Sequence, residues 1–182
     1  MTTWFISDTH FCHRRIIELA KRPFRDADEM DEAMVQRWNA RVAPQDTVWH
    51  LGDFVVSSNE AHAAAIFWRL NGTKHLIVGN HDEDAPATLA LPWASIDELA
   101  RIEVDGQKIM LCHYPMRTWP DAQKGAIHLF GHMHGRLSGT DLSCDMGVEL
   151  WDYRPASLVE IRARLRRQKP DPDFRESGKA RR

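Results

Sequence analysis

Five short polar clusters carry side chains that bind metal ions or move protons, and each follows a stretch typical of a buried β-strand. In chain order they are Asp8-Thr9-His10, Gly52-Asp53, Gly79-Asn80-His81-Asp82, His113 and Gly131-His132-Met133-His134. All of them supply oxygen or imidazole-nitrogen ligands. Because α/β folds assemble their sites at strand ends, the clusters together predict a hydrolase centre that holds two metal ions.

The segments before these clusters have the length and composition of strands. They are residues 4–7, 47–51, 74–78, 108–112 and 127–130. The first three alternate with helical patterns, which predicts a largely parallel sheet and an α/β fold. The turn Asp105-Gly106 predicts a hairpin over residues 102–112, and a further strand is expected within residues 142–149.

Three helices have recognisable N-terminal signals. Asp26 precedes a stripe of apolar residues, Ser58 or Asn59 precedes an alanine-rich segment, and Ser157 opens the last amphipathic segment. Tryptophans lie in such apolar stripes and are expected to pack inside the protein, among them Trp38, Trp68 and Trp151.

Size and composition indicate one domain with a proper core. The chain has 182 residues, is 43% hydrophobic and carries a net charge of -2, which argues against general attraction to nucleic acid or membranes. We assign the domain to residues 1–168. Residues 162–182 hold nine Arg or Lys against three Asp or Glu. Residues 169–182 are expected to form a basic, flexible C-terminal tail, because they have too few apolar residues to pack.

The cellular compartment is predicted from the apolar runs, the first residues and the cysteines of the sequence. It has no apolar run of about 18 residues and no signal-like start, so no membrane segment is expected. Its three cysteines are odd in number and lack CxxC spacing, which fits reduced thiols. A cytoplasmic protein is therefore predicted.

In this order, the five clusters resemble the pattern of calcineurin-like metallophosphoesterases, which runs DxH, GD, GNH[DE], H and GHxH. The resemblance extends from Trp4 to about Trp151 and fills every metal-binding position with the expected residue type. It implies a small, single-domain member of bacterial or phage type. The implied fold is a two-sheet β-sandwich flanked by α-helices, a four-layer α/β arrangement with the metal site at the strand ends.

The resemblance also implies which residues hold the two ions. The ligands would be Asp53 as the bridge, with Asp8, His10 and His134 at the first ion and Asn80, His113 and His132 at the second. Two dications against two carboxylates leave positive charge, which attracts an anionic phosphate and acidifies water. Four imidazoles with oxygen ligands and no thiolate favour Mn, Fe, Co, Ni or Zn over Mg or Ca, and Mn²⁺ is the expected ion.

The implied reaction is hydrolysis of a phosphodiester, or of a phosphomonoester, by attack of a metal-bridging hydroxide. In the family the histidine at the position of His81 is not a ligand but points at the phosphate. There it protonates the leaving oxygen or stabilises developing charge, and Asp82 is expected to hold its other ring nitrogen. The remaining histidines are expected to be ordinary polar residues, with His13 the first exception to consider because it shares a loop with His10.

Substrate and partners stay open at this level. A small phosphodiester, a nucleotide monoester, a nucleic-acid end and a phosphoprotein all fit, and residues 83–95 and 114–125 are expected to shape access. The basic tail hints at nucleic acid, but a solvated charged segment is the stronger interpretation. The alternative from another class is a catalytically inactive scaffold, as a retromer subunit with this fold is. The sequence does not indicate the oligomeric state.

Overall fold

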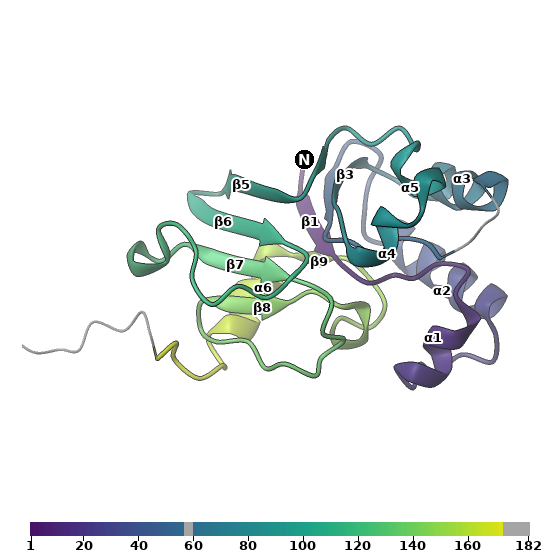
Figure 1. The fold of residues 1–182 in the computed structure, drawn as a ribbon. Coiled ribbons are helices and arrows are strands. Elements are labelled where there is room, and N and C mark those ends of the chain that lie inside the picture. Colours follow the sequence, from purple (N-terminus) through teal and green to yellow (C-terminus); the bar gives the residue numbers. More distant parts are fainter. Residues whose placement is uncertain (57–59, 173–182) are drawn as a thin grey trace, which may run out of the picture.

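The structure, a computed structural model, describes residues 1–56 and 60–172 of the chain. Strands and helices alternate up to β3, strands dominate the second half, and a helix lies near the end (Figure 1). In chain order the elements are β1 (Thr3–Ile6), α1 (Arg14–Leu19), α2 (Ala27–Asn39), β2 (Thr47–His50), α3 (Glu60–Arg69), β3 (Thr73–Ile77), α4 (Asn80–Glu83), α5 (Pro86–Leu89), β4 (Ile96–Asp97), β5 (Leu99–Val104), β6 (Gln107–Cys112), the 3₁₀ helix η1 (Ala122–Lys124), β7 (Ile127–Phe130), β8 (Ser143–Asp145), the 3₁₀ helix η2 (Val148–Leu150), β9 (Ala156–Ser157) and α6 (Leu158–Leu165).

The first sheet brings three of the polar clusters to one edge. Its strand order is β4-β3-β2-β1-β9, and the pairs β1–β2, β2–β3 and β3–β4 are parallel, as the alternating pattern predicts. Only β9 joins antiparallel, beside β1. Parallel strands end at the same edge of a sheet. Asp8, Asp53 and Asn80, which follow β1, β2 and β3, are therefore neighbours.

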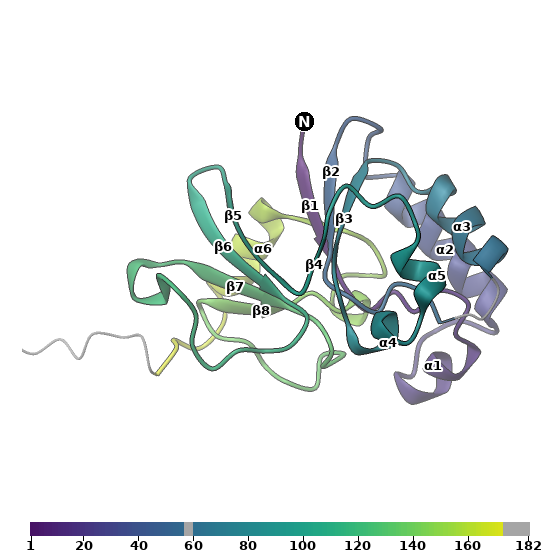
Figure 2. The ribbon, with the colours of Figure 1, turned by 45° about the horizontal axis from the view of Figure 1, so that its top comes forward.

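The second sheet delivers the remaining two clusters. Its order is β5-β6-β7-β8, with the predicted antiparallel hairpin between β5 and β6 and parallel pairing from β6 to β8. His113 follows β6 and Gly131 follows β7, and the Gly131 amide donates to the His113 carbonyl at 2.8 Å. The predicted pair of sheets with flanking helices is confirmed, and Figure 2 shows α2 and α3 on the side of the first sheet that faces away from the second.

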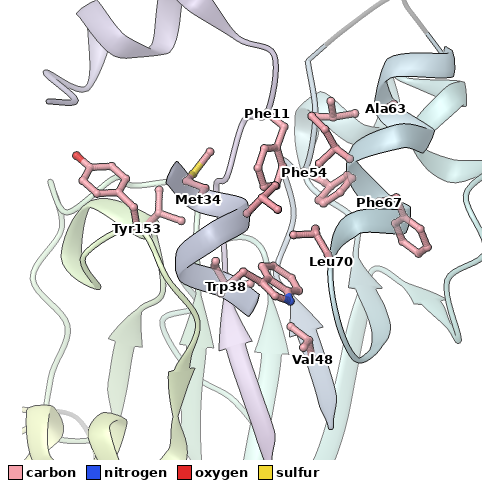
Figure 3. Close-up of a cluster of buried hydrophobic side chains, with 14 of the residues drawn as sticks. Phe11, Met34, Trp38, Val48, Phe54, Ala63, Phe67, Leu70 and Tyr153 are labelled. Carbon is pink, nitrogen blue, oxygen red and sulfur yellow. The ribbon is translucent and has the colours of Figure 1, made fainter. Parts of the chain in front are cut away.

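Two apolar cores hold this arrangement together. Between the sheets, Phe5 and Ile77 of the first sheet pack in one cluster with Leu111 and Leu129 of the second. On the outer side of the first sheet, α2 and α3 pack on the strands through the cluster that Figure 3 shows, which contains Trp38. Burial of each large apolar side chain is worth about 1.5–3 kcal/mol. The strand ends that carry the polar clusters are thereby fixed from both sides.

The outer face of the second sheet is covered by an irregular segment rather than by a long helix. Met110 of β6 packs there with Trp119 and Ala126. His128 of β7 is buried on the same face, where its Nδ1 donates to the Met110 carbonyl at 3.1 Å and its Nε2 accepts from the Met116 amide at 3.1 Å. The segment before β7 therefore serves as the cover of this sheet.

The predicted helix starts are confirmed where the structure describes them. Asp26 accepts a hydrogen bond from the Glu29 amide at 2.9 Å, and Ser157 forms a capping box with Glu160. The cap expected at Ser58 or Asn59 lies outside the described residues. In the described part, residues 1–56 and 60–172, none of the helices has the length and apolar content needed to cross a membrane.

One sequence expectation is wrong, and one predicted strand is shorter than its range. Trp68 does not pack inside but is 71% exposed on α3, whereas Trp38 and Trp151 are buried as predicted. The strand expected within residues 142–149 is present as β8, but it ends at Asp145. There the Asp145 carboxylate accepts the Gly147 and Gly135 amides, both at 2.8 Å, which turns the chain away from the sheet and into η2.

The start of the predicted tail is attached to the domain. Asp171 is 7% exposed, and its carboxylate accepts from the Thr140 hydroxyl at 3.0 Å. The Lys169 carbonyl accepts from the Asp141 amide at 2.9 Å. Residues 173–182 lie outside the described residues. The domain boundary after residue 168 therefore stays a prediction.

Candidate metal centre

The polar clusters lie on short loops whose backbone is held in an uncommon conformation. Five of the predicted ligands have positive φ angles between 48° and 67°: Asp8, His10, Asp53, His132 and His134. This left-handed region disfavours residues with a Cβ atom, so the surroundings must hold it. The Asp8 amide donates to the Gly52 carbonyl at 3.0 Å and the His10 amide to the Asp53 carbonyl at 2.9 Å, which ties the first loop to the second.

One carboxylate oxygen lies between imidazoles that come from the two different sheets. Asp53 Oδ2 is 3.4 Å from His10 Nε2 and 3.6 Å from His113 Nε2. The other oxygen, Oδ1, accepts from the His81 backbone amide at 3.0 Å. The Asp53 side chain is 2% exposed. Asp53 therefore occupies the position that a bridging ligand needs.

A first group of donor atoms meets on one side of Asp53. Asp8 Oδ1 is 3.7 Å from His134 Nε2, and ligand atoms of Asp8, His10 and His134 all lie within 4.8 Å of one another. His10 Nε2 is buried and has no hydrogen-bond partner among the described residues. An unpartnered buried nitrogen beside two carboxylates fits a cation.

A second group meets on the other side. Asn80 Oδ1 is 3.0 Å from His132 Nδ1 and 3.3 Å from His113 Nε2. The Leu51 carbonyl lies 2.7 Å from His113 Nδ1, which assigns the proton of the neutral ring to Nδ1. His113 Nε2 then presents a lone pair to the oxygens of Asn80 and Asp53. Such a set of facing acceptors is stabilised by a cation between them.

The protonation of the carboxylates and imidazoles reflects this burial. Burial raises the pKa of Asp8 to about 8, although the charge of His134 opposes the shift. Burial also lowers the pKa of His10 to about 4, which leaves its ring neutral and able to act as a ligand. For Asp53, burial works toward a higher pKa, but the close approach of the His10 and His113 imidazoles outweighs it and holds the pKa below the ordinary value.

Two glycines permit the loops to approach this closely. A Cβ at Gly131 would overlap Ser7 and would lie 2.6 Å from Asp8 Oδ2. A Cβ at Gly79 would overlap the Asp53 carboxylate and would lie 2.7 Å from the Asp53 amide. The glycines of GHMH and GNHD are therefore required by contact distance rather than by backbone angle.

The expected pairing of Asp82 with the His81 ring is wrong. Asp82 is buried, and its carboxylate accepts from the backbone amides of Asp53 at 2.7 Å, Gly79 at 2.9 Å and Phe54 at 3.0 Å. It points behind the loop because three amides there lack other acceptors. His81 is exposed at the rim, with its ring centroid 5.1 Å from that of His10. Asp82 thus positions the Asp53 loop.

Sequence reasoning missed two residues that support the first group. Glu149 Oε1 lies 2.9 Å from His134 Nδ1 and accepts from Arg22 Nη2 at 2.7 Å. Arg22, 4% exposed, also donates to the carbonyls of Asp8 and Thr9, both at 2.7 Å. Burial alone would raise the pKa of Glu149, but His134 and Arg22 lower it to about 2. This ion pair therefore connects the loop after β1 to the His134 ring.

The sequence contained a pattern that could have identified Glu149 as a site residue. It contained none that could have identified Arg22. Asp145 ends a strand and Glu149 follows within a glycine-containing turn, the same arrangement that marks the other clusters. Because a strand was expected within residues 142–149, Glu149 was not recognised as a candidate site residue. Arg22 lies between two helices and reaches the site only through the fold.

Glu149→Gln is expected to weaken the binding of a divalent metal ion by about 10- to 100-fold, the usual cost of losing a partner of a metal-bound histidine. The amide keeps the volume but removes the charge that orients His134. Calorimetric titration with Mn²⁺ measures the affinity. Glu32→Gln is the matched control, because Glu32 pairs with Arg69 on the helical surface. Unchanged affinity in a Glu149→Gln protein that melts like the parent would contradict this role.

Three of the other histidines have contacts that the structure defines. His50 is buried and its Nε2 lies 3.0 Å from the Thr9 hydroxyl, and His75 Nδ1 lies 2.9 Å from the Ser95 hydroxyl. His13, the expected exception, has its Nδ1 3.3 Å from His10 Nδ1. It therefore contacts a proposed ligand without joining either group.

All seven predicted ligands are thus brought to one place, with His81 at its rim. A family model of the calcineurin-like phosphoesterase superfamily domain matches residues 1–144. The chain belongs to this superfamily. Membership supports hydrolysis of phosphoric esters with divalent metal ions, and the convergent donor groups agree with it.

Related proteins cover most of this chain. Uncharacterized protein MJ1445 of Methanocaldococcus jannaschii is 33% identical in an alignment 163 positions long, which covers 85% of this chain and 86% of that protein. The Gene 66 protein of Mycobacterium phage D29 is 30% identical in an alignment 178 positions long, which covers 81% of this chain and 88% of that protein. The crystal structure of AQ665 from Aquifex aeolicus, a protein of unknown function, superposes with a TM-score of 0.66 and 27% identity, over 88% of this chain and 97% of that one.

Proposed function

We propose that this phosphoesterase is a dinuclear phosphodiesterase. One ion would be held by Asp8, His10 and His134. The other would be held by Asn80, His113 and His132. Both ions would share Asp53 as a ligand. The observation that carries the proposal is the position of Asp53 Oδ2 between His10 Nε2 and His113 Nε2, at 3.4 and 3.6 Å. The donor set of imidazoles, carboxylates and one amide supports Mn²⁺, with Fe, Zn, Ni and Co as the alternatives.

The reaction is hydrolysis of the ester bond. A water oxygen bonds to phosphorus, the bond to the leaving oxygen breaks, and His81 gives that oxygen a proton or stabilises its charge. When bound, the ions lower the pKa of the attacking water and draw charge from the phosphoryl oxygens. The exposure of His81 at the rim supports this role, because the leaving group departs toward solvent. Asp82 acts by holding the Asp53 loop.

A cavity of 650 Å³ over the donor groups supports small-molecule substrates. This volume is within the range of about 300–1,000 Å³ usual for such sites. Two arginines of the basic C-terminal helix contact the protein itself, which weighs against their use in nucleic-acid binding. Arg164 lies 5.0 Å over the Trp151 ring and donates to the Leu150 carbonyl, and Arg162 donates to the Asp105 carbonyl. A cytoplasmic location remains part of the proposal.

Hydrolysis of bis-p-nitrophenyl phosphate and of p-nitrophenyl phosphate with added Mn²⁺ tests the proposal. We expect turnover of the diester to exceed that of the monoester, and a chelator to abolish both. Faster turnover of the monoester would instead indicate a phosphomonoesterase. Turnover of neither, in protein shown by calorimetry to bind Mn²⁺, would favour the inactive scaffold.

A further inference from the structure

The cavity over the metal centre is walled on one side by α1 and the residues after it. Arg15, Ile16, Leu19 and Lys21 line that wall, and Arg136 contributes from the loop after His134. The segments 83–95 and 114–125, expected from the sequence to shape access, supply none of its lining residues. Outside the donor groups, this side of the cavity is therefore formed by α1, the residues that follow it and Arg136.

The wall holds positive charge that no carboxylate neutralises. Among the described residues, Arg15, Lys21 and Arg136 take part in no ion pair, whereas four other arginines near α2 and α3 do: Arg25, Arg37, Arg41 and Arg69. Within the part of the chain that the structure describes, Asp53 is the only acidic lining residue, and it belongs to the candidate metal centre. Arg136 is held in place, because its Nε donates to the Met133 carbonyl at 3.1 Å.

This charge exceeds what one phosphodiester needs. A diester carries a single negative charge, and the metal centre already supplies positive charge for it. Guanidinium groups match phosphate through paired N–H donors, so two of them at a cavity wall suit a second phosphate. The cavity therefore favours a substrate with more than one anionic group.

An apolar patch lies beside these cationic side chains. Ile16 and Leu19 are spaced i and i+3, so they share one face of α1, and Ala20 follows directly as its C-cap. Ile16 is 5% exposed and forms the buried base of this patch, while Leu19 is 64% exposed and forms its surface. A planar or apolar group resting on Leu19 would cover surface that is otherwise in contact with water.

Resting on the proposed function, we propose that the natural substrate is a nucleotide-type phosphodiester that carries a second phosphate. The scissile diester lies at the metal centre, the base rests on Leu19 and Ile16, and the second phosphate binds Arg15 and Arg136. Lys21 adds positive charge at the mouth of the cavity. The wall of α1 is then the specificity element of the enzyme.

A series of three p-nitrophenyl diesters separates these contributions. They are bis-p-nitrophenyl phosphate, thymidine 5′-(p-nitrophenyl phosphate) and the 3′-phosphorylated form of the latter. In the second, a nucleoside replaces one nitrophenyl group, and the third adds a phosphate to that nucleoside; the bond that breaks, between phosphorus and the nitrophenyl oxygen, stays the same. We expect kcat/KM to rise along the series, with the second phosphate contributing about tenfold or more. Calorimetry with thymidine 3′,5′-bisphosphate and thymidine 5′-monophosphate, in the presence of Mn²⁺, gives a readout independent of turnover.

Single substitutions show which residue is responsible for each increase in kcat/KM along the series. Arg15→Ala and Arg136→Ala should each reduce the advantage of the 3′-phosphorylated substrate, and of the bisphosphate in binding, by about tenfold. Leu19→Ala should instead reduce the advantage of the nucleoside over bis-p-nitrophenyl phosphate. Arg101→Ala is the matched control, since Arg101 lies on β5 and is 62% exposed. Variants that change neither ratio more than the control does would overturn the inference. Failure of every variant and the parent to hydrolyse bis-p-nitrophenyl phosphate would instead overturn the proposed function.

Discussion

Asp53→Asn is expected to abolish diesterase activity and the binding of a pair of ions. Asp53 Oδ1 accepts from the His81 amide at 3.0 Å, so the carbonyl oxygen of asparagine must take that position. The amide nitrogen then replaces Oδ2 and directs two N–H groups at the place where His10 and His113 meet. N–H donors at this position would repel a metal cation. The substitution also removes the negative charge of the carboxylate proposed to bridge the two ions. The loss of affinity should exceed the about 100-fold that follows from removing an outer partner of a ligand.

Metal content of the purified protein, turnover of bis-p-nitrophenyl phosphate and thermal unfolding measure this effect together. Asp121→Asn provides the matched control, because Asp121 pairs with Lys108 and Lys124 at the surface. We expect the control to keep both ions and full activity. Two tightly bound ions in an active Asp53→Asn protein would show that this carboxylate does not bridge them.

His81→Ala is expected to lower turnover by about 100- to 10,000-fold while the ions stay bound, the range for loss of a general acid. The effect should be larger for an alkyl ester than for a p-nitrophenyl ester, because the alkoxide needs the proton more. His81 approaches His10 and Asp53 closely enough that these three also form a possible ligand group, so metal content decides between the two roles.

Turnover against both classes of leaving group, normalised to bound metal, is the measurement. His75→Ala is the control for loss of a histidine, because His75 belongs to neither donor group and its Nδ1 lies 2.9 Å from the Ser95 hydroxyl. A fall in activity that matches the fall in bound metal would make His81 a ligand. Equal losses with both leaving groups would indicate charge stabilisation rather than proton transfer.

The site was largely predictable from sequence because its residues follow strands directly. The apolar runs before Asp8, Asp53, Asn80 and His113 indicate where strands end, and parallel pairing brings such ends together. The prediction was weaker where a polar residue stops a strand through its own hydrogen bonds. Asp145 does so by accepting the Gly135 and Gly147 amides, and the expected strand ran past it.

Contacts between segments that are far apart in the chain could not be predicted from the sequence. Nothing in the spacing of Arg22, His134 and Glu149 indicates that they meet, because their contact depends on how the loop after β1 lies against η2. The same holds for Asp82, whose neighbour His81 is adjacent in sequence but points elsewhere. Adjacent side chains on a short helix diverge by about 100°, so a shared motif does not imply a shared contact.

The sequence by itself determined the α/β fold class, the family and the identity of the side chains that converge, because ligand chemistry and strand ends are local properties of the chain. Only the tertiary structure decided which oxygen of Asp53 faces the imidazoles, which partner orients His134 and which helix walls the cavity. Those features depend on distances between segments far apart in sequence, and such distances are set by how the two sheets and the flanking helices pack.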